Sequence, residues 1–248
     1  FVGLQLAGGM DSLMVAFGAL GLYAIGKTFF WPTMLAVASD RFPRTGAVAI
    51  SIMGGIGMMS AGLIGSEGLG YGKDRFSAAA LEESAPDTYN EYKVGEGDAK
   101  GFLFFEKVQA IDGAKLAAVQ GKLGNARAIV AAGSLEKAGL VKDVKGLEGE
   151  EKTNAVKSEA DLVALEATLQ EAGVLKADGN TNFLADGMKG LTASEQKVQE
   201  ASIAGDRQTL KADSMIPLAM AVIYLLMMLY FKSKGGYKPL TIEEQEAS

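Results

Sequence analysis

Charge is distributed very unevenly along this chain, and this limits the folds that it can adopt. Residues 12–66 carry four charged side chains and residues 215–231 carry none, whereas residues 67–214 carry 25 Asp or Glu and 18 Lys or Arg. An average soluble domain does not segregate its charges in this way. The pattern therefore predicts an all-α membrane protein with a large, water-exposed and mainly helical insert.

Three stretches are long and apolar enough to form membrane helices. Leu13–Ala38 carries a single charge and can span a bilayer with some tilt. Ala47–Gly65 contains five glycines, and Met215–Phe231 has Pro217 in its first turn. Phe1–Met10 would cross only about half of the hydrocarbon layer. We expect it to be the end of a spanning helix whose beginning is missing, so that the chain is a fragment.

Basic residues predict the orientation of these segments. Arg41 and Arg44 lie in the short loop between the first two segments, and Lys232, Lys234 and Lys238 follow the third. The positive-inside rule assigns both clusters to the cytoplasm. The predicted regions are a transmembrane part at 1–66, an insert on the outer, periplasmic side at 67–214, a transmembrane helix at 215–231 and a cytoplasmic tail at 232–248.

Composition excludes several classes of function. The chain has no Cys and no His, and so lacks thiol chemistry, histidine-ligated metal sites and the usual proton shuttle near neutral pH. Its net charge of −6 does not favour nucleic acid, and it contains no G-x-x-x-x-G-K-[ST] loop for nucleotides. We expect no enzymatic activity, no metal and no cofactor. Gly101–Val108, the most apolar part of the insert, is predicted to be a small core strand or a lid on the membrane surface, with core packing favoured.

Lys27 is the most informative residue of the first segment. It lies 13 residues before Asp40, and about 20 Å of helix rise is more than a lysine side chain can span to reach the interface. A charge buried in the membrane costs a few kcal/mol, so the amine is expected to face a partner or a watery cavity. It would bind solute or pair with a carboxylate that takes a coupling proton, or it would form a purely structural ion pair.

Other residues of these segments are candidates for binding or packing. Thr28 and Trp31 lie beside Lys27; Trp31 would stack on a sugar ring or fill the bundle, with packing favoured. Pro32 is expected to bend the helix. In the second segment, small residues recur at i, i+4 and i+8 and predict one face for close helix packing, with a flexing role as the alternative. These residues are Gly57, Ala61 and Gly65.

The stretch GKTFFWPTMLAVASDRFPRTGA resembles the C-terminal helices of a major facilitator superfamily transporter. Its turn, Asp40-Arg41-Phe42-Pro43-Arg44-x-Gly46, resembles the cytoplasmic turn between helices ten and eleven of that family. The glycine-rich segment resembles helix eleven, and the third segment resembles helix twelve. More narrowly, the chain is similar to bacterial transporters with a long outer insert between the last two helices, including the GFLFF and YFKSKGGYK stretches. The resemblance covers nearly the whole chain.

The resemblance implies twelve helices in two six-helix halves, of which this chain would hold the end of helix nine and helices ten to twelve. It implies a secondary transporter fragment that moves a small solute, a sugar or an organic anion, across the inner membrane by alternating access. Its partners would be lipid, the missing helices or other membrane subunits, and the solute. The alternative is a membrane-anchored accessory or scaffold subunit derived from a truncated transporter.

Overall fold

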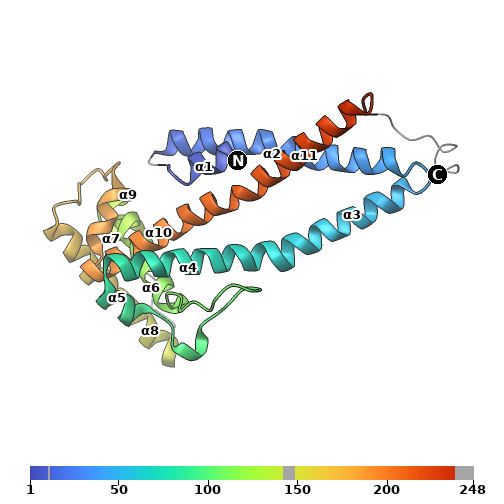
Figure 1. Cartoon of the computed structure of the whole chain (residues 1–248). Helices are drawn as coiled ribbons and strands as arrows, with labels where there is room; N and C mark the ends of the chain where they lie inside the picture. Colours follow the sequence, from blue (N-terminus) through green and yellow to red (C-terminus); the bar gives the residue numbers. More distant parts are fainter. Residues whose placement is uncertain (11, 142–148, 238–248) are drawn as a thin grey trace. The chain divides into compact units, whose positions relative to one another are not determined.

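Helices build the structure, as predicted. The computed structural model describes residues 1–10, 12–141 and 149–237, and β-structure within these ranges is limited to two isolated bridges. Figure 1 labels the main helices along the chain. In order, the helical elements are α1 Val2–Ala7, α2 Leu13–Arg41, α3 Gly46–Ser60, η1 Ala61–Gly65, α4 Ser66–Ser84, α5 Pro86–Tyr92, η2 Glu96–Asp98, α6 Gly113–Ala132, α7 Leu135–Ala138, α8 Gly149–Glu171, α9 Phe183–Asp186, η3 Gly187–Gly190, α10 Ala193–Asp213 and α11 Met215–Ser233.

The chain divides into two compact units. Unit 1 consists of Phe1–Ser77, Lys100–Val108 and Ala204–Ser248, and unit 2 of Ala78–Ala99 and Gln109–Ile203. Unit 1 therefore contains all three predicted membrane segments, and unit 2 contains most of the charged insert. The helices α4 and α10 each contribute residues to both units.

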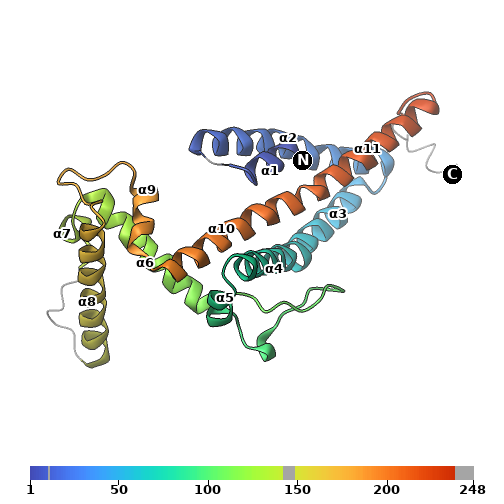
Figure 2. The ribbon, with the colours of Figure 1, turned by 60° about the vertical axis from the view of Figure 1, so that its left-hand side comes forward.

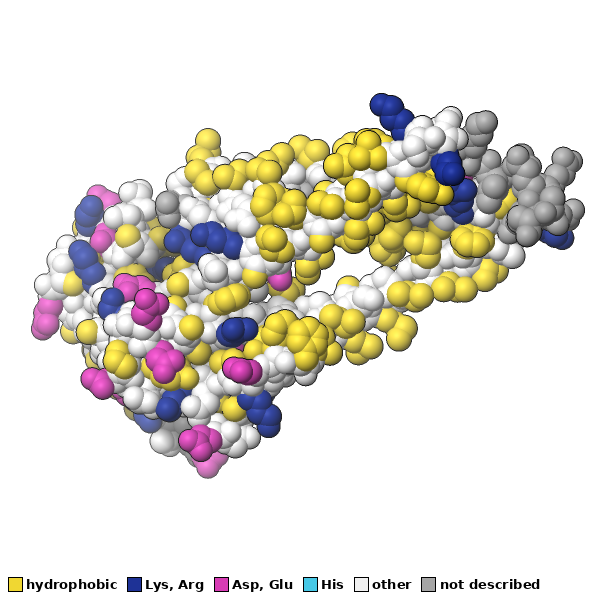
Figure 3. All heavy atoms as spheres, viewed as in Figure 1, with side chains coloured by type: hydrophobic (Ala, Val, Ile, Leu, Met, Phe, Trp, Pro, Cys, Tyr) yellow, Lys and Arg dark blue, Asp and Glu magenta, His cyan; other side chains and the backbone are white. Residues whose placement is uncertain are grey.

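Within the described ranges, three helical runs are long and apolar enough to cross a membrane, which confirms the predicted number. They are Met14–Arg41, Gly46–Ser84 and Ala193–Ser233. Hydrophobic side chains cover α2, α3 and α11 in Figure 3, with few charges among them. Almost none of the residues in their most apolar windows are buried within the chain. These surfaces therefore require lipid or other helices as neighbours.

Two of the runs extend well beyond the predicted membrane segments. Gly46–Ser84 is 39 residues long and Ala193–Ser233 is 41. At 1.5 Å per residue each is about 60 Å long, roughly twice the thickness of the hydrocarbon layer. The apolar stretches are bounded close to the predicted positions 67 and 214, whereas helix continues past both positions into the charged insert. The insert is thus joined to the membrane segments by continuous helix rather than by loops.

We call the extensions within unit 1, Ser66–Ser77 of α4 and residues 204–213 of α10, the stalk. Its two helices meet closely at Gly205, where an added Cβ would lie only 2.7 Å from the backbone nitrogen of Ser77. Thr209 packs beside Gly72 in the same way, with 3.3 Å between its methyl carbon and the position of a Cβ. The Lys73 ammonium forms an ion pair of 3.1 Å with Asp206. The absence of a side chain at Gly205 therefore permits the tightest contact of the stalk.

The N-terminal segment packs against α2 and the base of the stalk. Gly3 of the six-residue helix α1 approaches α2 so closely that a Cβ would lie 2.8 Å from the carbonyl oxygen of Ala19. The amide of Gln5 donates a hydrogen bond of 2.7 Å to the hydroxyl of Ser214, which is fully buried where α10 gives way to α11. These contacts tie the start of the chain to the start of α11.

Unit 2 has a hydrophobic core formed by α6, α7 and α8. Asp112 begins α6 as an N-cap by accepting hydrogen bonds from two backbone N–H groups. Gly133 ends α6 in the left-handed conformation, with φ of 86°, beside the carbonyl oxygen of Lys176. Figure 2 shows α8 meeting the C-terminal part of α6, from which the two helices diverge. The core residues are Ala126, Ile129, Val130, Leu135, Leu162, Leu165, Leu169 and Val174.

The favoured prediction for Gly101–Val108, a core strand, is wrong. These residues form an exposed loop of unit 1, closed by the bridge between Lys100 and Val108. At its tip, Leu103 is 71% exposed and Phe104 is 86% exposed. Apolar composition alone did not distinguish a buried segment from one that has its hydrophobic side chains on the surface.

A glycine pair tests the close contact in the stalk. We expect Gly205→Ala to destabilise the protein by about 1–3 kcal/mol, because its methyl group would overlap Ser77. The control is Gly70→Ala in α4, where nothing lies within 4 Å; a helical Gly→Ala change in open space is neutral or stabilises by up to about 1 kcal/mol. Thermal unfolding in lipid nanodiscs, followed by circular dichroism, measures both. Equal shifts in the two variants would contradict the contact.

Candidate functional site

Lys27 lies on the stripe of α2 that contains several of its more buried residues, although its own side chain is exposed. Successive residues turn by about 100°, so Tyr23, Met34 and Ala38 lie within about 40° of Lys27 around the helix. Ala38 is buried, and Tyr23 and Met34 are partly buried. The most exposed apolar residues lie on the opposite face, with Met14 83% exposed. Lys27 thus belongs to the side of α2 that packs against other helices.

Aromatic contacts follow Lys27 along the same side of α2. The Trp31 ring covers Gly57 of α3, where an added Cβ would lie 2.7 Å from the ring edge. The Phe30 and Tyr224 rings pack edge to face, with 5.7 Å between centroids, and so join α2 to α11. The side chain of Lys27 itself remains exposed, with Nζ 6.0 Å from the centroid of the Tyr23 ring. That distance is at the outer limit of a cation–π contact.

Thr28 and Pro32 lie beside this stripe. The Thr28 hydroxyl donates a hydrogen bond of 2.8 Å to the carbonyl of Ala24, which satisfies its proton within the helix. The helix α2 continues through Pro32 to Arg41. Pro32 has no N–H for the carbonyl of Thr28, one turn earlier. Thr28 therefore offers acceptor oxygens, but no unused hydroxyl proton, next to Lys27.

The predicted cytoplasmic turn makes contacts with the end of α11. The α2 helix ends at Arg41, and α3 begins at Gly46, which lies against Ser39. The Arg41 guanidinium lies 4.7 Å from the centroid of Phe231 and 5.2 Å from that of Tyr237. The Tyr237 hydroxyl donates a hydrogen bond of 3.2 Å to Asp40. The turn and the segment after α11 are therefore joined at one end of unit 1.

The remaining predicted residues at this end of unit 1 lie in the turn or near the end of α11. Pro43 lies within the turn, which is closed by a hydrogen bond from the Thr45 N–H to the Phe42 carbonyl. Arg44, in the same turn, also has an interaction partner. Lys232 and Lys234 are exposed near the end of α11, whereas Lys238 lies outside the described residues. Burial, followed by the nearby Asp40 carboxylate, raises the pKa of the Tyr237 hydroxyl.

The three predicted packing positions of the glycine-rich segment differ in burial and in the contacts that they make. Gly57 accommodates Trp31, as described above, whereas Ala61 is exposed and Gly65 is partly buried. A π-helical turn, η1, covers Ala61–Gly65. The i, i+4, i+8 pattern assumes α-helix throughout, and a π turn changes that register. Another helix lies against Gly57, whereas a Cβ at Gly65 would meet only the carbonyl oxygen of Ser60, in the same helical run.

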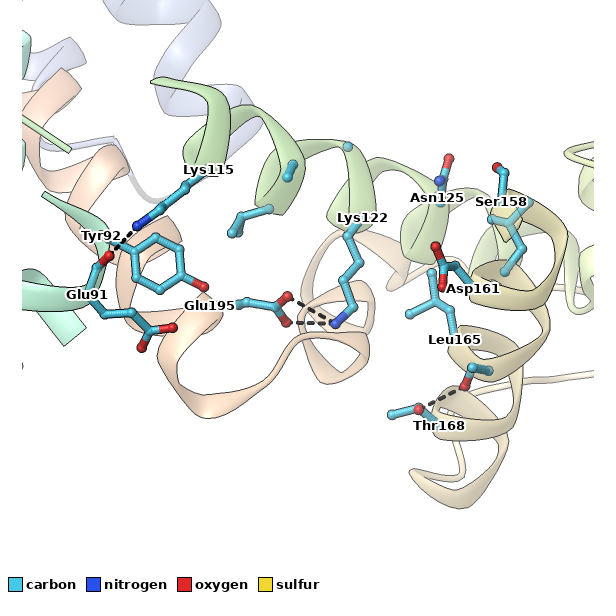
Figure 4. A pocket seen from close by; sticks show the side chains of 15 residues that line it. Glu91, Tyr92, Lys115, Lys122, Asn125, Ser158, Asp161, Leu165, Thr168 and Glu195 are labelled. Carbon is cyan, nitrogen blue, oxygen red and sulfur yellow. Dashed lines mark hydrogen bonds and ion pairs between the residues drawn. The ribbon is translucent and has the colours of Figure 1, made fainter. Parts of the chain in front are cut away.

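Unit 2 contains an open groove of about 780 Å³ between α6 and α8 (Figure 4). Lys122 of α6 forms an ion pair of 2.8 Å with Glu195 at the start of α10. Figure 4 shows Tyr92 beside Glu195, and Asp161 and Ser158 of α8 farther along the groove. Among the residues that the structure describes, no cluster of three metal-ligating side chains occurs. The groove therefore offers charged and polar side chains for contacts with another molecule.

Glu195 has a structural role that the sequence analysis missed. Its carboxylate accepts a hydrogen bond of 2.7 Å from the Thr192 N–H, and the Thr192 hydroxyl accepts one from the Glu195 N–H. This reciprocal pair is a capping box, whose signature T-x-x-E is visible in the sequence. Burial alone would raise the pKa of Glu195, but the hydrogen bonds from Lys122 and Thr192 lower it below its usual value. The pKa of Tyr92 is raised by burial and then by Glu195 and Glu91.

The lowered pKa of Glu195 predicts how the stability of unit 2 depends on pH. Because the folded state favours the carboxylate, its contribution is present above the pKa of unfolded Glu and is lost as the pH falls through the folded pKa. We expect Glu195→Gln to cost about 1 kcal/mol at neutral pH, since Lys122 is partly solvated. The difference from the parent protein should vanish in acid. Urea unfolding of the full chain in nanodiscs, at several pH values, measures it.

The control for this prediction is Glu200→Gln in the same helix. Glu200 forms an ion pair of 2.9 Å with Lys197, but both side chains are well exposed. Exposed pairs of this kind contribute little to stability. Equal effects of the two substitutions at neutral pH would show that Glu195 has no special role.

Comparisons with family models, with curated proteins and with solved structures found no match to this chain. Any function assigned to it therefore depends on its own residues and on the contacts that they make.

Proposed function

We propose that this chain forms part of the helical bundle of a secondary transporter of the major facilitator type. It would move a small solute, a sugar or an organic anion, across the bacterial inner membrane by alternating access. The observation that carries the proposal is the position of Lys27. A charged residue at the middle of an apolar helix, on the side that packs against other helices, is typical of a solute or proton pathway.

The length of α2 gives Lys27 no simple route to water. The residue is 14 positions from Leu13 and 14 from Arg41, or about 21 Å along the helix in each direction. A charged amine at the bilayer centre costs about 2.5–3.5 kcal/mol on insertion scales. Because the Lys27 side chain is exposed within this chain, we expect a neighbour from outside the chain to offset this cost. That neighbour would be a water-filled cavity, a solute or an acidic residue on a further helix.

The residues around Lys27 suit a solute with hydroxyl or anionic groups. The amine would bind such a group directly, or it would pair with a carboxylate that takes a coupling proton. Tyr23 and Trp31 provide aromatic faces one turn on either side of Lys27. Trp31 already packs on Gly57, which supports a structural role for that ring. A structural ion pair between Lys27 and a further helix is the alternative for the amine.

The contacts at the end of unit 1 support the proposed orientation. Arg41 and Tyr237 lie against each other, so the basic turn and the segment after α11 share one end of the unit. In the proposed topology, two membrane crossings, through α3 and α11, separate these segments along the chain. An even number of crossings returns the chain to the side from which it started. If that side is the cytoplasm, residues 67–214 are periplasmic.

Cysteine labelling tests this orientation, because the natural chain has no Cys. In spheroplasts, we expect Ala155→Cys in α8 to react with an impermeant maleimide, and Ser39→Cys in the cytoplasmic end of α2 to react only after lysis. Labelling of position 39 but not of position 155 in intact spheroplasts would reverse the assignment.

A second candidate is a membrane-anchored accessory or scaffold subunit of a larger membrane complex. The observation in its favour is that unit 2 has a hydrophobic core of its own and a groove lined by charged side chains. In this case the membrane helices would anchor unit 2, and its groove would contact another protein. Lys27 would then form a dry structural ion pair.

Accessibility at position 27 distinguishes the two candidates. In the full-length protein, Lys27→Cys should react with a small water-soluble maleimide if the residue lines a wet pathway. Ile25→Cys and Phe29→Cys, on the opposite face, should resist labelling because they face lipid. A Lys27→Cys protein that resists labelling as well as these controls do would exclude a watery pathway there.

Uptake provides the functional test of the same residue. We expect Lys27→Leu to lower uptake per folded molecule by roughly tenfold or more, because a lost charge-assisted interaction is worth about 1.5–3 kcal/mol. The measurement uses the full-length protein and a panel of radiolabelled monosaccharides and organic anions, with Lys27→Arg as the conservative variant. Unchanged uptake of a transported compound by Lys27→Leu would reject the role of the amine.

A further inference from the structure

The exposed loop Gly101–Lys107, which we call the aromatic loop, belongs to unit 1 together with the membrane helices. Two backbone hydrogen bonds between Lys100 and Val108 close it, and a third joins the Phe105 N–H to the Phe102 carbonyl across the tip. The loop is therefore a defined turn, and its apolar tip is held in one conformation.

The tip has an unusual backbone. Leu103 has a φ of 51°, and among the described residues it is the single non-glycine residue with positive φ. A side chain in this region costs roughly 1–2 kcal/mol, which a glycine would avoid. The chain nevertheless has Leu103 there, next to Phe104, and both side chains are largely exposed. Strain combined with exposed apolar surface indicates a functional surface rather than a folding requirement.

The base of the loop is fixed to the stalk helix α4. The Tyr71 ring lies 6.1 Å from that of Phe102 and 5.8 Å from that of Phe105, between centroids. The Tyr71 hydroxyl donates a hydrogen bond of 2.8 Å to the carbonyl of Glu106. Phe102 also packs against Gly68, with 3.3 Å to the position of a Cβ. The loop thus has a firm attachment on α4.

This attachment lies just beyond the apolar stretch of the second segment. The apolar stretch of the second segment ends at Gly65, and Gly68 and Tyr71 follow three and six residues later. They lie about 5–9 Å farther along the helix, which is the thickness of the interfacial layer beside the hydrocarbon. In Figures 1 and 2 the green loop between α5 and α6 reaches along α4 toward α3. Its tip is therefore directed toward the hydrocarbon edge.

We propose that the aromatic loop inserts Leu103 and Phe104 into the outer headgroup–acyl boundary of the bilayer and so anchors the stalk to the membrane surface. Aromatic and aliphatic side chains bind favourably at this depth. Lys100, just before the loop, and Lys107, its last residue, remain in the polar headgroup layer. The occupant is lipid, and the role does not depend on whether the chain transports a solute.

Spin labelling of the full chain in lipid vesicles tests the anchor, because single cysteines can be introduced without removing others. A nitroxide at Phe104→Cys should relax strongly with oxygen, which concentrates in lipid, and weakly with a water-soluble nickel complex. Two controls on the neighbouring helix calibrate the depth. Ile64→Cys, in the apolar stretch, should report lipid, and Arg75→Cys, ten residues beyond Gly65, should report water.

The outcomes are distinct. A depth at position 104 close to that of position 64 supports the anchor. Water-like accessibility equal to that at position 75 overturns it. Exclusion of both oxygen and nickel would also overturn it, since the loop would then be covered by protein, such as a second copy of the chain.

Discussion

The close approach of α4 and α10 at Gly205 is the contact on which the rest of unit 1 depends. Because Gly205 has no side chain, the backbone of Ser77 can lie against α10, and the Lys73–Asp206 ion pair forms nearby. The same two helices carry other attachments: Tyr71 of α4 holds the aromatic loop, and Ser214, at the end of α10, holds the N-terminal segment through Gln5. The stalk therefore connects segments that lie far apart in the sequence.

The sequence predicted those features that depend on local composition. The predicted apolar segments coincide with three described helical runs that are long and apolar enough to span a membrane, since the transfer of side chains into lipid is nearly additive along a segment. The helical character of the insert also follows from local propensity. The continuation of helix across the boundaries at 67 and 214 was not predicted, because these boundaries were placed where the apolar composition ends, and polar helix formers continue both helices beyond it. Local signals mark the far ends of both helices: Pro86 follows Ser84 by two residues, and Thr192 of the capping box precedes Ala193.

Features that depend on distant partners could not be predicted. The position of the aromatic loop is set by Tyr71 and Gly68, more than thirty residues earlier in the chain. Lys122 and Glu195 form an ion pair across a long sequence separation, although the capping box that orients Glu195 is a local motif and could have been found. Lys27 was identified from the sequence because the free-energy cost of a charged side chain in lipid depends on its position in the apolar segment and not on distant residues. The inward side of α2 becomes visible only from the burial of residues around it.

The apolar helices bury almost none of their surface within the chain, so their surroundings decide whether these surfaces are favourable. In water their exposed apolar surfaces would be strongly unfavourable, and between lipid chains the same surfaces are satisfied without any protein neighbour. Contacts between the described apolar helices include Trp31 on Gly57 and Phe30 on Tyr224. Lys27 is the exception, because lipid satisfies its apolar neighbours but not its charge. Because the charge of Lys27 is unfavourable in lipid, this residue requires a polar or charged partner that lipid chains do not supply.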